Sequence, residues 1–222
     1  MEKSTGFRKG FEEIQDKILV MGNMVTKEIN HSIEALKKRD LKAAHQIIAA
    51  DAKIDELRYA IENMCIELVG TQKHKTDDLR VIVAVLSITT ELERIGDYAE
   101  GIARIVVMIG DEPPLKPLID IPRMADLTTE MIEKSLKSFV TRDIEMAKHV
   151  VTMDNSVDAL YDQVFRELLT FMMVDPKTIN RATRLIWVAH NLERAADRVT
   201  NICERVVFTV TGKMEDLEVS KY

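Results

Sequence analysis

Apolar residues recur every three or four positions through six long segments of the chain, with charged residues between them. This spacing places the apolar side chains on one face of an α-helix. Alternating β-branched or aromatic runs, which would predict strands, are nearly absent. The pattern therefore predicts an all-α protein of six long helices, at about residues 8–38, 40–69, 77–109, 119–141, 143–173 and 176–211.

Glycine and proline positions agree with these limits. Gly70, Gly110 and Gly212 follow three of the predicted helices, where glycine is a common C-cap residue. Pro176 fits the first turn of the last helix. Three of the five prolines lie in the stretch DEPPLKP at residues 111–117, which predicts a helix stop followed by a linker.

The pattern restarts after this linker, and the two halves match in register. Arg39-Asp40-Leu41 recurs 103 positions later as Arg142-Asp143-Ile144. We therefore predict one unit written twice, with residues 1–112 and 119–222 joined by a linker at 113–118. Each half is expected to form an antiparallel three-helix bundle, and a pseudo-twofold axis is expected to relate the two bundles.

The candidate chemistry lies in acidic residues that the repeat keeps. Glu93 and Asp97 in the third helix recur as Glu193 and Asp197 in the sixth. Glu100 and Glu204 extend the same two stripes, on the side of the helix away from its apolar face. Like charges four residues apart destabilise a helix by a few tenths of a kcal/mol. Because this repulsion occurs in both halves, we expect a positive charge to offset it, either from Arg94 and Arg194 beside the acids or from a bound cation.

The second helix of each half supplies further carboxylates. Asp51 and Asp55 recur as Asp154 and Asp158, beside the apolar stripe where a neighbouring helix would pack. If the second and third helices lie side by side, four carboxylates converge in each half. Such an oxygen-only set suits hard cations: Fe(III), Mn, Mg or Ca, with Zn tolerated. A single acidic pair on a helix is usually only solvated, but an in-register repeat favours a metal site.

Composition changes this picture in two ways. The net charge of −6 argues against nucleic-acid binding, which needs a basic face, and suits a bound cation or a basic partner as well as plain solubility. No apolar run approaches the roughly 20 residues that span a bilayer, no signal peptide is evident, and the two cysteines form no disulfide framework. We expect a cytoplasmic protein without membrane insertion, which could lie at the inner face of the membrane through protein partners.

The segments ELERIGDYAEGIARIV and NLERAADRVTNICERVV, together with the matching second helices, resemble the PhoU family of phosphate-transport regulators. The resemblance implies a two-bundle helical fold that is often dimeric, and metal ions, above all multinuclear iron, with Zn, Mn or Mg as alternatives. It implies a non-enzymatic negative regulator that couples the phosphate ABC transporter to a membrane sensor histidine kinase. By position, the expected metal ligands are Glu93, Asp97, Glu193 and Asp197, joined by Asp51, Asp55, Asp154 and Asp158.

The two halves also depart from each other. Asn201-Ile202-Cys203-Glu204 matches a stretch that the family often carries, whereas Arg104 replaces the acid in the first half. Conversely, Glu100 is acidic where Thr200 is not. We therefore expect two inequivalent sites, the first of which binds fewer ions or binds them more weakly.

An alternative from another class is a carboxylate-bridged metalloenzyme. Such an enzyme would hold its acids and histidines inside a bundle, whereas these acids lie at the margin of the predicted core. His190, three residues before Glu193, remains open as a ligand, and Cys203 is expected to pack in the core. No phosphate loop or nucleophile motif is present, so we expect a protein that is not an enzyme.

Overall fold

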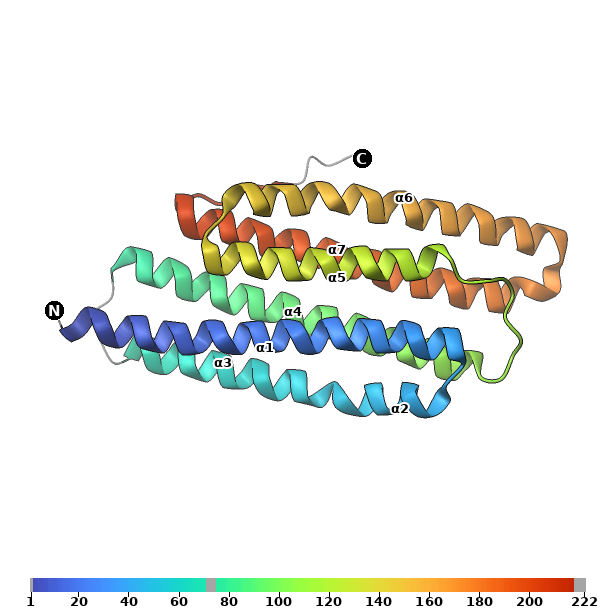
Figure 1. Ribbon diagram of the computed structural model, residues 1–222, viewed down its shortest axis with the longest axis horizontal. Coiled ribbons are helices and arrows are strands. Elements are labelled where there is room, and N and C mark those ends of the chain that lie inside the picture. Colours follow the sequence, from blue (N-terminus) through green and yellow to red (C-terminus); the bar gives the residue numbers. More distant parts are fainter. Residues whose placement is uncertain (1, 71–74, 218–222) are drawn as a thin grey trace.

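The computed structural model describes residues 2–70 and 75–217, with side chains from residue 7 onward. Within these residues the chain is helical and contains no strand, which confirms the predicted fold class (Figure 1). The helices are α1 (Glu2–Lys38), α2 (Leu41–Ala50), α3 (Ala52–Gly70), α4 (Thr76–Ile109), α5 (Asp120–Thr141), α6 (Ile144–Val174) and α7 (Ile179–Thr211), with a 3-10 turn η1 (Pro176–Thr178) before α7.

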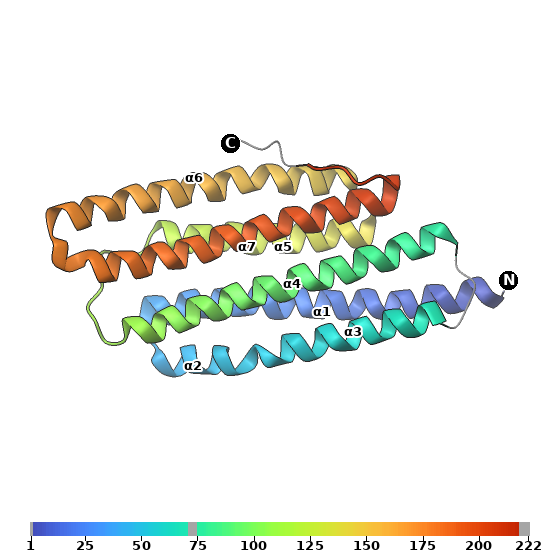
Figure 2. The same ribbon diagram turned by 180° about the vertical axis from the view of Figure 1, so that it is seen from behind.

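The helices lie side by side along the long axis of the molecule as two trios (Figures 1 and 2). In the first trio α1 and α4 contact each other and the α2–α3 pair, and in the second α5, α6 and α7 contact one another. The trios meet where α1 contacts α5 and α4 contacts α7, so that α2–α3 and α6 lie on opposite outer sides. Helix α5 runs opposite to α1, and α7 opposite to α4, as a pseudo-twofold axis perpendicular to the helices requires.

The two trios share one apolar core. Ile18 and Leu92 from the first trio and Met131 and Leu192 from the second are all fully buried members of a single hydrophobic cluster. Gly22 marks where α1 and α5 approach closely, because a Cβ there would lie 2.1 Å from Cδ1 of Leu136. The predicted limits at 112 and 119 therefore separate two helical units along the chain but not two separate cores.

A repeated turn explains why the halves keep register between their first two helices. Arg39 and Arg142 both adopt the left-handed conformation, each with φ of 55°. The aspartate that follows each arginine caps the next helix: Asp40 Oδ1 accepts from the backbone N–H of Ala43 at 2.9 Å, and Asp143 Oδ1 from that of Met146 at 2.9 Å. The sequence repeat Arg-Asp thus reports a repeated turn and cap.

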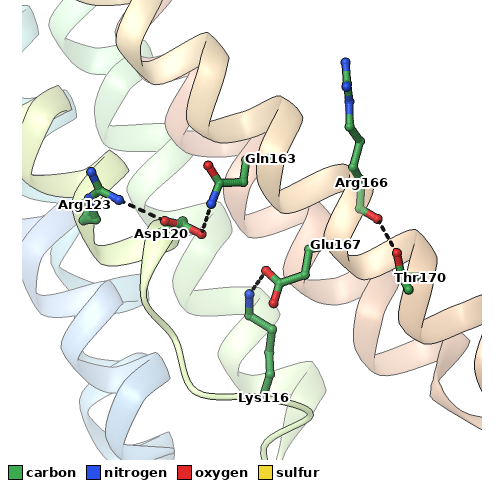
Figure 3. Close-up of polar contacts among 7 residues, drawn as sticks. All are labelled: Lys116, Asp120, Arg123, Gln163, Arg166, Glu167 and Thr170. Carbon is green, nitrogen blue, oxygen red and sulfur yellow. Dashed lines mark hydrogen bonds and ion pairs between the residues drawn. The ribbon is translucent and has the colours of Figure 1, made fainter.

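Polar contacts fasten the linker to the second trio (Figure 3). The ammonium of Lys116 pairs with Glu167 on α6. Asp120, which is buried at the start of α5, accepts from Gln163 of α6 at 3.1 Å and from Arg123 at 3.3 Å. On the α7 side, Arg184 binds Glu112 at 2.9 Å. The proline-rich segment is therefore held against α6 and α7 rather than hanging between the trios.

One predicted helix was wrong in detail. The single helix expected at 40–69 is interrupted at Asp51, where the backbone N–H of Ile54 bonds to the Asp51 carbonyl at 2.8 Å, a contact of 3-10 type. The interruption accompanies a close approach to α4 at Gly96, where a Cβ would lie only 3.0 Å from Cδ1 of Ile54. The second half has Ala196 at the matching position, and α6 runs through Asp154 unbroken.

The ends of the other helices differ less from the predicted ends. Helix α1 begins at Glu2 instead of residue 8, and the 3-10 turn at Pro176–Thr178 delays the start of α7 to Ile179. The predicted caps at Gly110 and Gly212 are confirmed, with φ of 61° and 72°. Helix α3 ends at Gly70 as expected, although the loop after it lies outside the described residues. Cys203 is fully buried, as predicted.

Candidate metal centres

The predicted acids of the first trio come together between α2–α3 and α4. We call Asp51, Asp55, Glu93, Asp97 and Glu100 the first acid cluster. Asp51 lies against α4 at Gly96, since Oδ1 of Asp51 is 3.6 Å from where a Cβ of Gly96 would be. The structure thus places Asp51 beside α4, the helix that carries Glu93, Asp97 and Glu100.

Burial and mutual repulsion govern the protonation of this cluster. Burial, followed by the charges of Glu100 and Asp97, raises the pKa of Asp51 to about 6. Burial is also the largest cause raising the pKa of Glu93, with Asp97 next. For Asp97 the same order holds, with Asp55 as the next cause. Carboxylates that hinder one another's ionisation in this way are stabilised in their ionised form by a nearby positive charge.

Arginines supply part of that charge. Arg58 of α3 donates to Glu93 at 3.1 Å and lies 3.4 Å from Glu62. Arg104 binds Glu100 at 2.6 Å. Arg94 also compensates these acids, because its charge lowers the pKa of Glu93 and that of Asp97.

The second trio holds a smaller group between α6 and α7, which we call the second acid cluster: Asp154, Asp158, Glu193 and Asp197. Burial, then the charge of Asp197, raises the pKa of Glu193 to about 7, with a smaller contribution from Asp158. Arg194 binds Asp197 at 2.6 Å, as the compensation hypothesis expected. Asp154 is half-buried one turn before Asp158 on α6. The structure therefore places Asp158 of α6 near Glu193 and Asp197 of α7.

Two of the predicted residues need separate description. Glu204 accepts from the backbone N–H of Leu217 at 3.2 Å, and it lies about 16 Å along α7 from Glu193 at the helical rise of 1.5 Å per residue. The structure therefore does not bring Glu204 to Glu193. His190 is close to the cluster: its Nδ1 lies 3.3 Å from Oε2 of Glu193, and its ring lies 6.0 Å from that of Tyr161.

The two clusters are connected across the contact between the trios. Arg194, which binds Asp197, also lies beside Tyr98 on α4, whose side chain is the largest cause raising the pKa of Arg194. Tyr98 lines a surface hollow together with Glu93 and Asp97 of the first acid cluster. One arginine thus contacts a member of the second cluster and a residue beside the first.

Sequence reasoning missed two charged residues of the first trio. Arg58 gave no repeated signal, because the second half has Tyr161 at the matching position. Glu28 of α1 is only 7% exposed, and burial followed by the charges of Asp51 and Glu100 raises its pKa to about 7. Its signal was available: Val25 and Ser32, three residues before and four after it, place Glu28 on the buried stripe of α1.

The donor set can be compared with the needs of a metal ion. Within residues 2–70 and 75–217, no three Asp, Glu, His or Cys side chains are close enough together to hold an ion as they stand. The chemistry of both clusters nevertheless fits a hard cation, because the ligands are carboxylates and their pKa values are raised by burial and by one another. A bound cation would offset the repulsion among these carboxylates.

Comparison with known proteins identifies what the chain is similar to. The family model described as PhoU domain matches residues 18–106 and again 121–206, one match for each helical unit. None of the described helices combines the length and apolarity needed to cross a membrane.

Named relatives match over most of their length. A phosphate-specific transport system accessory protein PhoU homolog from Aquifex aeolicus is 38% identical over 186 residues, covering 84% of each chain. A protein of the same name from Clostridium acetobutylicum is 37% identical over 212 residues, 95% of this chain and 97% of its own. The crystal structure of PhoU from Pseudomonas aeruginosa superposes with a TM-score of 0.88 at 30% identity, covering 93% of this chain and 100% of the other. That of the phosphate transport system regulatory protein PhoU from Streptococcus pneumoniae gives a TM-score of 0.87 at 28% identity, covering 95% and 99%.

Proposed function

The chain belongs to the PhoU family, and on this premise we propose that it regulates phosphate uptake as a metal-binding accessory protein of a phosphate transporter. The relatives are named accessory or regulatory proteins of phosphate transport, so the expectation of a protein that is not an enzyme is confirmed. The metalloenzyme alternative has no comparable support.

Metal binding is the chemical part of the proposal, and the burial of Glu193 beside Asp197 is the observation that carries it. The two carboxylates lie one turn apart on α7 with Asp158 of α6 near them, and burial raises the pKa of Glu193 to about 7. Glu193, Asp197, Asp154 and Asp158 would hold the cation of the second trio. Asp51, Asp55, Glu93 and Asp97 would hold that of the first. We propose multinuclear iron, as the family resemblance implies, with Zn, Mn or Mg as alternatives, since carboxylate ligands suit hard cations.

The cation would act as a structural clamp. Its charge would neutralise the repelling carboxylates and join the outer helix of each trio to the inner helix that contacts the other trio. We propose that the clamped form presents the surface that docks on the transporter, and that a sensor histidine kinase at the inner face of the membrane reads the complex. We expect the working assembly to be a homodimer.

Removal of the second acid cluster tests the metal assignment. We expect Glu193→Ala/Asp197→Ala to lose the metal of the second trio while helical content stays close to that of the parent protein. The measurement is elemental analysis of protein purified without chelator, with circular dichroism alongside.

Glu12 and Asp16 provide a matched control, because they have the same four-residue spacing on an exposed part of α1. Glu12→Ala/Asp16→Ala should keep the full metal content. Equal metal stoichiometry in the parent and the Glu193/Asp197 variant would refute the assignment. The regulatory role is tested separately, by whether the variant still represses a phosphate-starvation reporter in cells lacking the parent protein.

A further inference from the structure

An apolar hollow lies at the end of the molecule where α1 and α4 stop and α7 begins (Figure 1). The proline-rich linker forms part of its wall, and its volume is about 230 Å³. Leucine and isoleucine side chains from α1, α4, the linker and α7 line it: Leu36, Ile109, Leu115, Leu118 and Leu185. An apolar cavity of about 150 Å³ can hold one benzene molecule, so this hollow has room for one large apolar side chain.

Contacts of the linker keep the hollow preformed. Lys116, which lines the hollow, pairs with Glu167 of α6, and only 10% of its side chain is exposed (Figure 3). Arg181 of α7 donates to the carbonyl of Pro113 at 3.3 Å. Three prolines of the linker also line the hollow, and the fixed φ of proline restricts the conformations that the linker can adopt. A ligand would therefore lose little affinity in ordering this segment.

The side chains around the hollow are mostly cationic, although the chain as a whole has a net charge of −6. Two of the four cations on its wall already pair with acids, since Lys37 binds Glu34 at 2.8 Å and Lys116 binds Glu167. Glu112, the one carboxylate among the described residues of the wall, pairs with Arg184 outside it at 2.9 Å. The wall therefore keeps a positive charge that these pairs do not neutralise.

That charge belongs to Arg39 and Arg181, neither of which pairs with a carboxylate within residues 2–70 and 75–217. Arg39 is exposed at the turn after α1, where its φ of 55° fixes the backbone, and Arg181 is partly buried. A guanidinium binds a carboxylate through short, charge-assisted hydrogen bonds. Acidic groups at the mouth of the hollow would therefore find two available cations.

The sequence repeat does not account for this combination. The repeat places Val81, which is 7% exposed, where the second half has Arg181. Arg142, the counterpart of Arg39, lies at the other end of the molecule from the linker. Two arginines beside an apolar hollow therefore occur together at the linker end through residues that the two halves do not share.

We propose that this hollow is a docking site for an acidic segment of a protein partner, in which one large apolar side chain enters the hollow and neighbouring Asp or Glu side chains bind Arg39 and Arg181. Apolar anchors that fill such pockets provide much of the affinity in protein interfaces. The volume favours a side chain over a free small ligand, because sites for such ligands usually enclose roughly 300 Å³ or more. The inference rests on the regulatory role proposed above and names the chemistry that its docking partner would present.

Peptide binding by the intact chain tests the site. The probe is a fluorescein-labelled peptide with Asp-Phe-Glu between Gly-Ser flanks, and fluorescence anisotropy measures its Kd. One control peptide has Ala in place of Phe, and another has Asn and Gln in place of the two acids. The protein variant is Arg39→Gln/Arg181→Gln. Its matched control is Arg8→Gln/Arg166→Gln, which removes two exposed arginines that do not line the hollow.

We expect the Asp-Phe-Glu peptide to bind Arg39→Gln/Arg181→Gln about tenfold more weakly than the parent, because charge-assisted hydrogen bonds are lost. The Arg8→Gln/Arg166→Gln protein should bind it as the parent does, and both control peptides should bind the parent more weakly. Absence of binding, equal binding of the three peptides, or equal affinity of the three proteins would overturn the docking site. Binding of 3-phenylpropionate as tightly as the peptide would instead identify a small-ligand site and also overturn it.

Metal analysis and the phosphate-starvation reporter separate this inference from the proposed function. Arg39→Gln/Arg181→Gln should keep the metal content of the parent but repress the reporter less, and full repression would contradict a docking role. If no peptide binds while Glu193→Ala/Asp197→Ala still loses metal and repression, only the docking site is wrong. If the peptide binds as expected but the parent does not repress the reporter, the regulatory role is wrong.

Discussion

The residues around Glu193 determine whether its carboxyl is protonated in the folded protein. Its side chain is 21% exposed and has Asp197 one turn away, with Asp158, Arg194, His190 and Tyr161 around it. Arg194 lowers its pKa, but less than burial and Asp197 raise it. Without a bound cation, Glu193 is therefore an acid that the folded state prefers to keep protonated.

This preference predicts a pH dependence of stability. Folding raises the pKa of Glu193 from 4.5 to about 7, so the folded state binds its proton more tightly than the unfolded state does. The resulting stabilisation is complete below about pH 4.5 and is lost as the pH rises through about 7. For metal-free protein, we expect Glu193→Gln to reduce the loss of unfolding free energy between pH 5 and 8 by roughly 1–3 kcal/mol.

Urea unfolding in the presence of a chelator at each pH measures this difference. Glu130→Gln is the control, since the side chain of Glu130 is half exposed and pairs with Lys134 one turn along α5. If the parent and Glu193→Gln lose stability equally over this range, Glu193 is not the group responsible.

Residues also differ in how far the sequence could predict them. The repeated acids were predictable because each appears twice in register. Glu28 has no acidic counterpart in the second half, so its signal was weaker: its place between Val25 and Ser32 on the buried stripe of α1. Its raised pKa has burial as the largest cause, followed by the charges of Asp51 and Glu100, which are distant in the sequence.

At the scale of elements, the turn between the first two helices of each trio has the clearest cause. An arginine in the left-handed region stops the first helix, and the next aspartate caps the second. Left-handed conformations are unfavourable for residues other than glycine, so the cap and the helices on either side must outweigh that cost.

Removing a cap should therefore be measurable. We expect Asp143→Ala to lower the free energy of unfolding by about 1 kcal/mol, because the N–H of Met146 loses its acceptor. Asp40→Ala should have a similar effect through Ala43. Chemical denaturation measures both. Asp162→Ala, an exposed change in the middle of α6, should alter stability by less than about 0.5 kcal/mol, and an equal effect of all three would exclude the capping explanation.

The helices themselves were largely predictable from apolar spacing, and the break at Asp51 was not. Nothing in the local sequence stops a helix there, and the matching residue Asp154 lies inside an unbroken α6. The break coincides with a tertiary contact: a Cβ at Gly96 of α4 would lie only 3.0 Å from Cδ1 of Ile54, and the second half has Ala196 at the matching position.

At the scale of the whole molecule, the shared core matters more than the linker. Apolar residues of both trios belong to one cluster, and α4 contacts α7 along their length. The sequence repeat predicted two units but could not show how much apolar surface each unit leaves for the other. That surface depends on which helices face across the pseudo-twofold axis.

This core predicts cooperative behaviour. We expect metal-free full-length protein to unfold in one calorimetric transition, because neither trio can open without exposing the other. A chain of residues 1–112 alone should self-associate through the uncovered faces of α1 and α4. Light scattering measures its mass. A monomeric half that unfolds cooperatively, or two separate transitions in the whole chain, would contradict a common core.

The opposite directions of the two trios have a topological consequence. Helix α4 leaves the first trio at the end where α5 enters the second, and α7 finishes at the other end, where α1 begins. The start of α1 and the end of α7 therefore lie at the same end of the molecule. A circular permutant that joins these two ends and opens the chain between α4 and α5 would keep every contact between helices. In that permutant the ribosome would make the second half before the first.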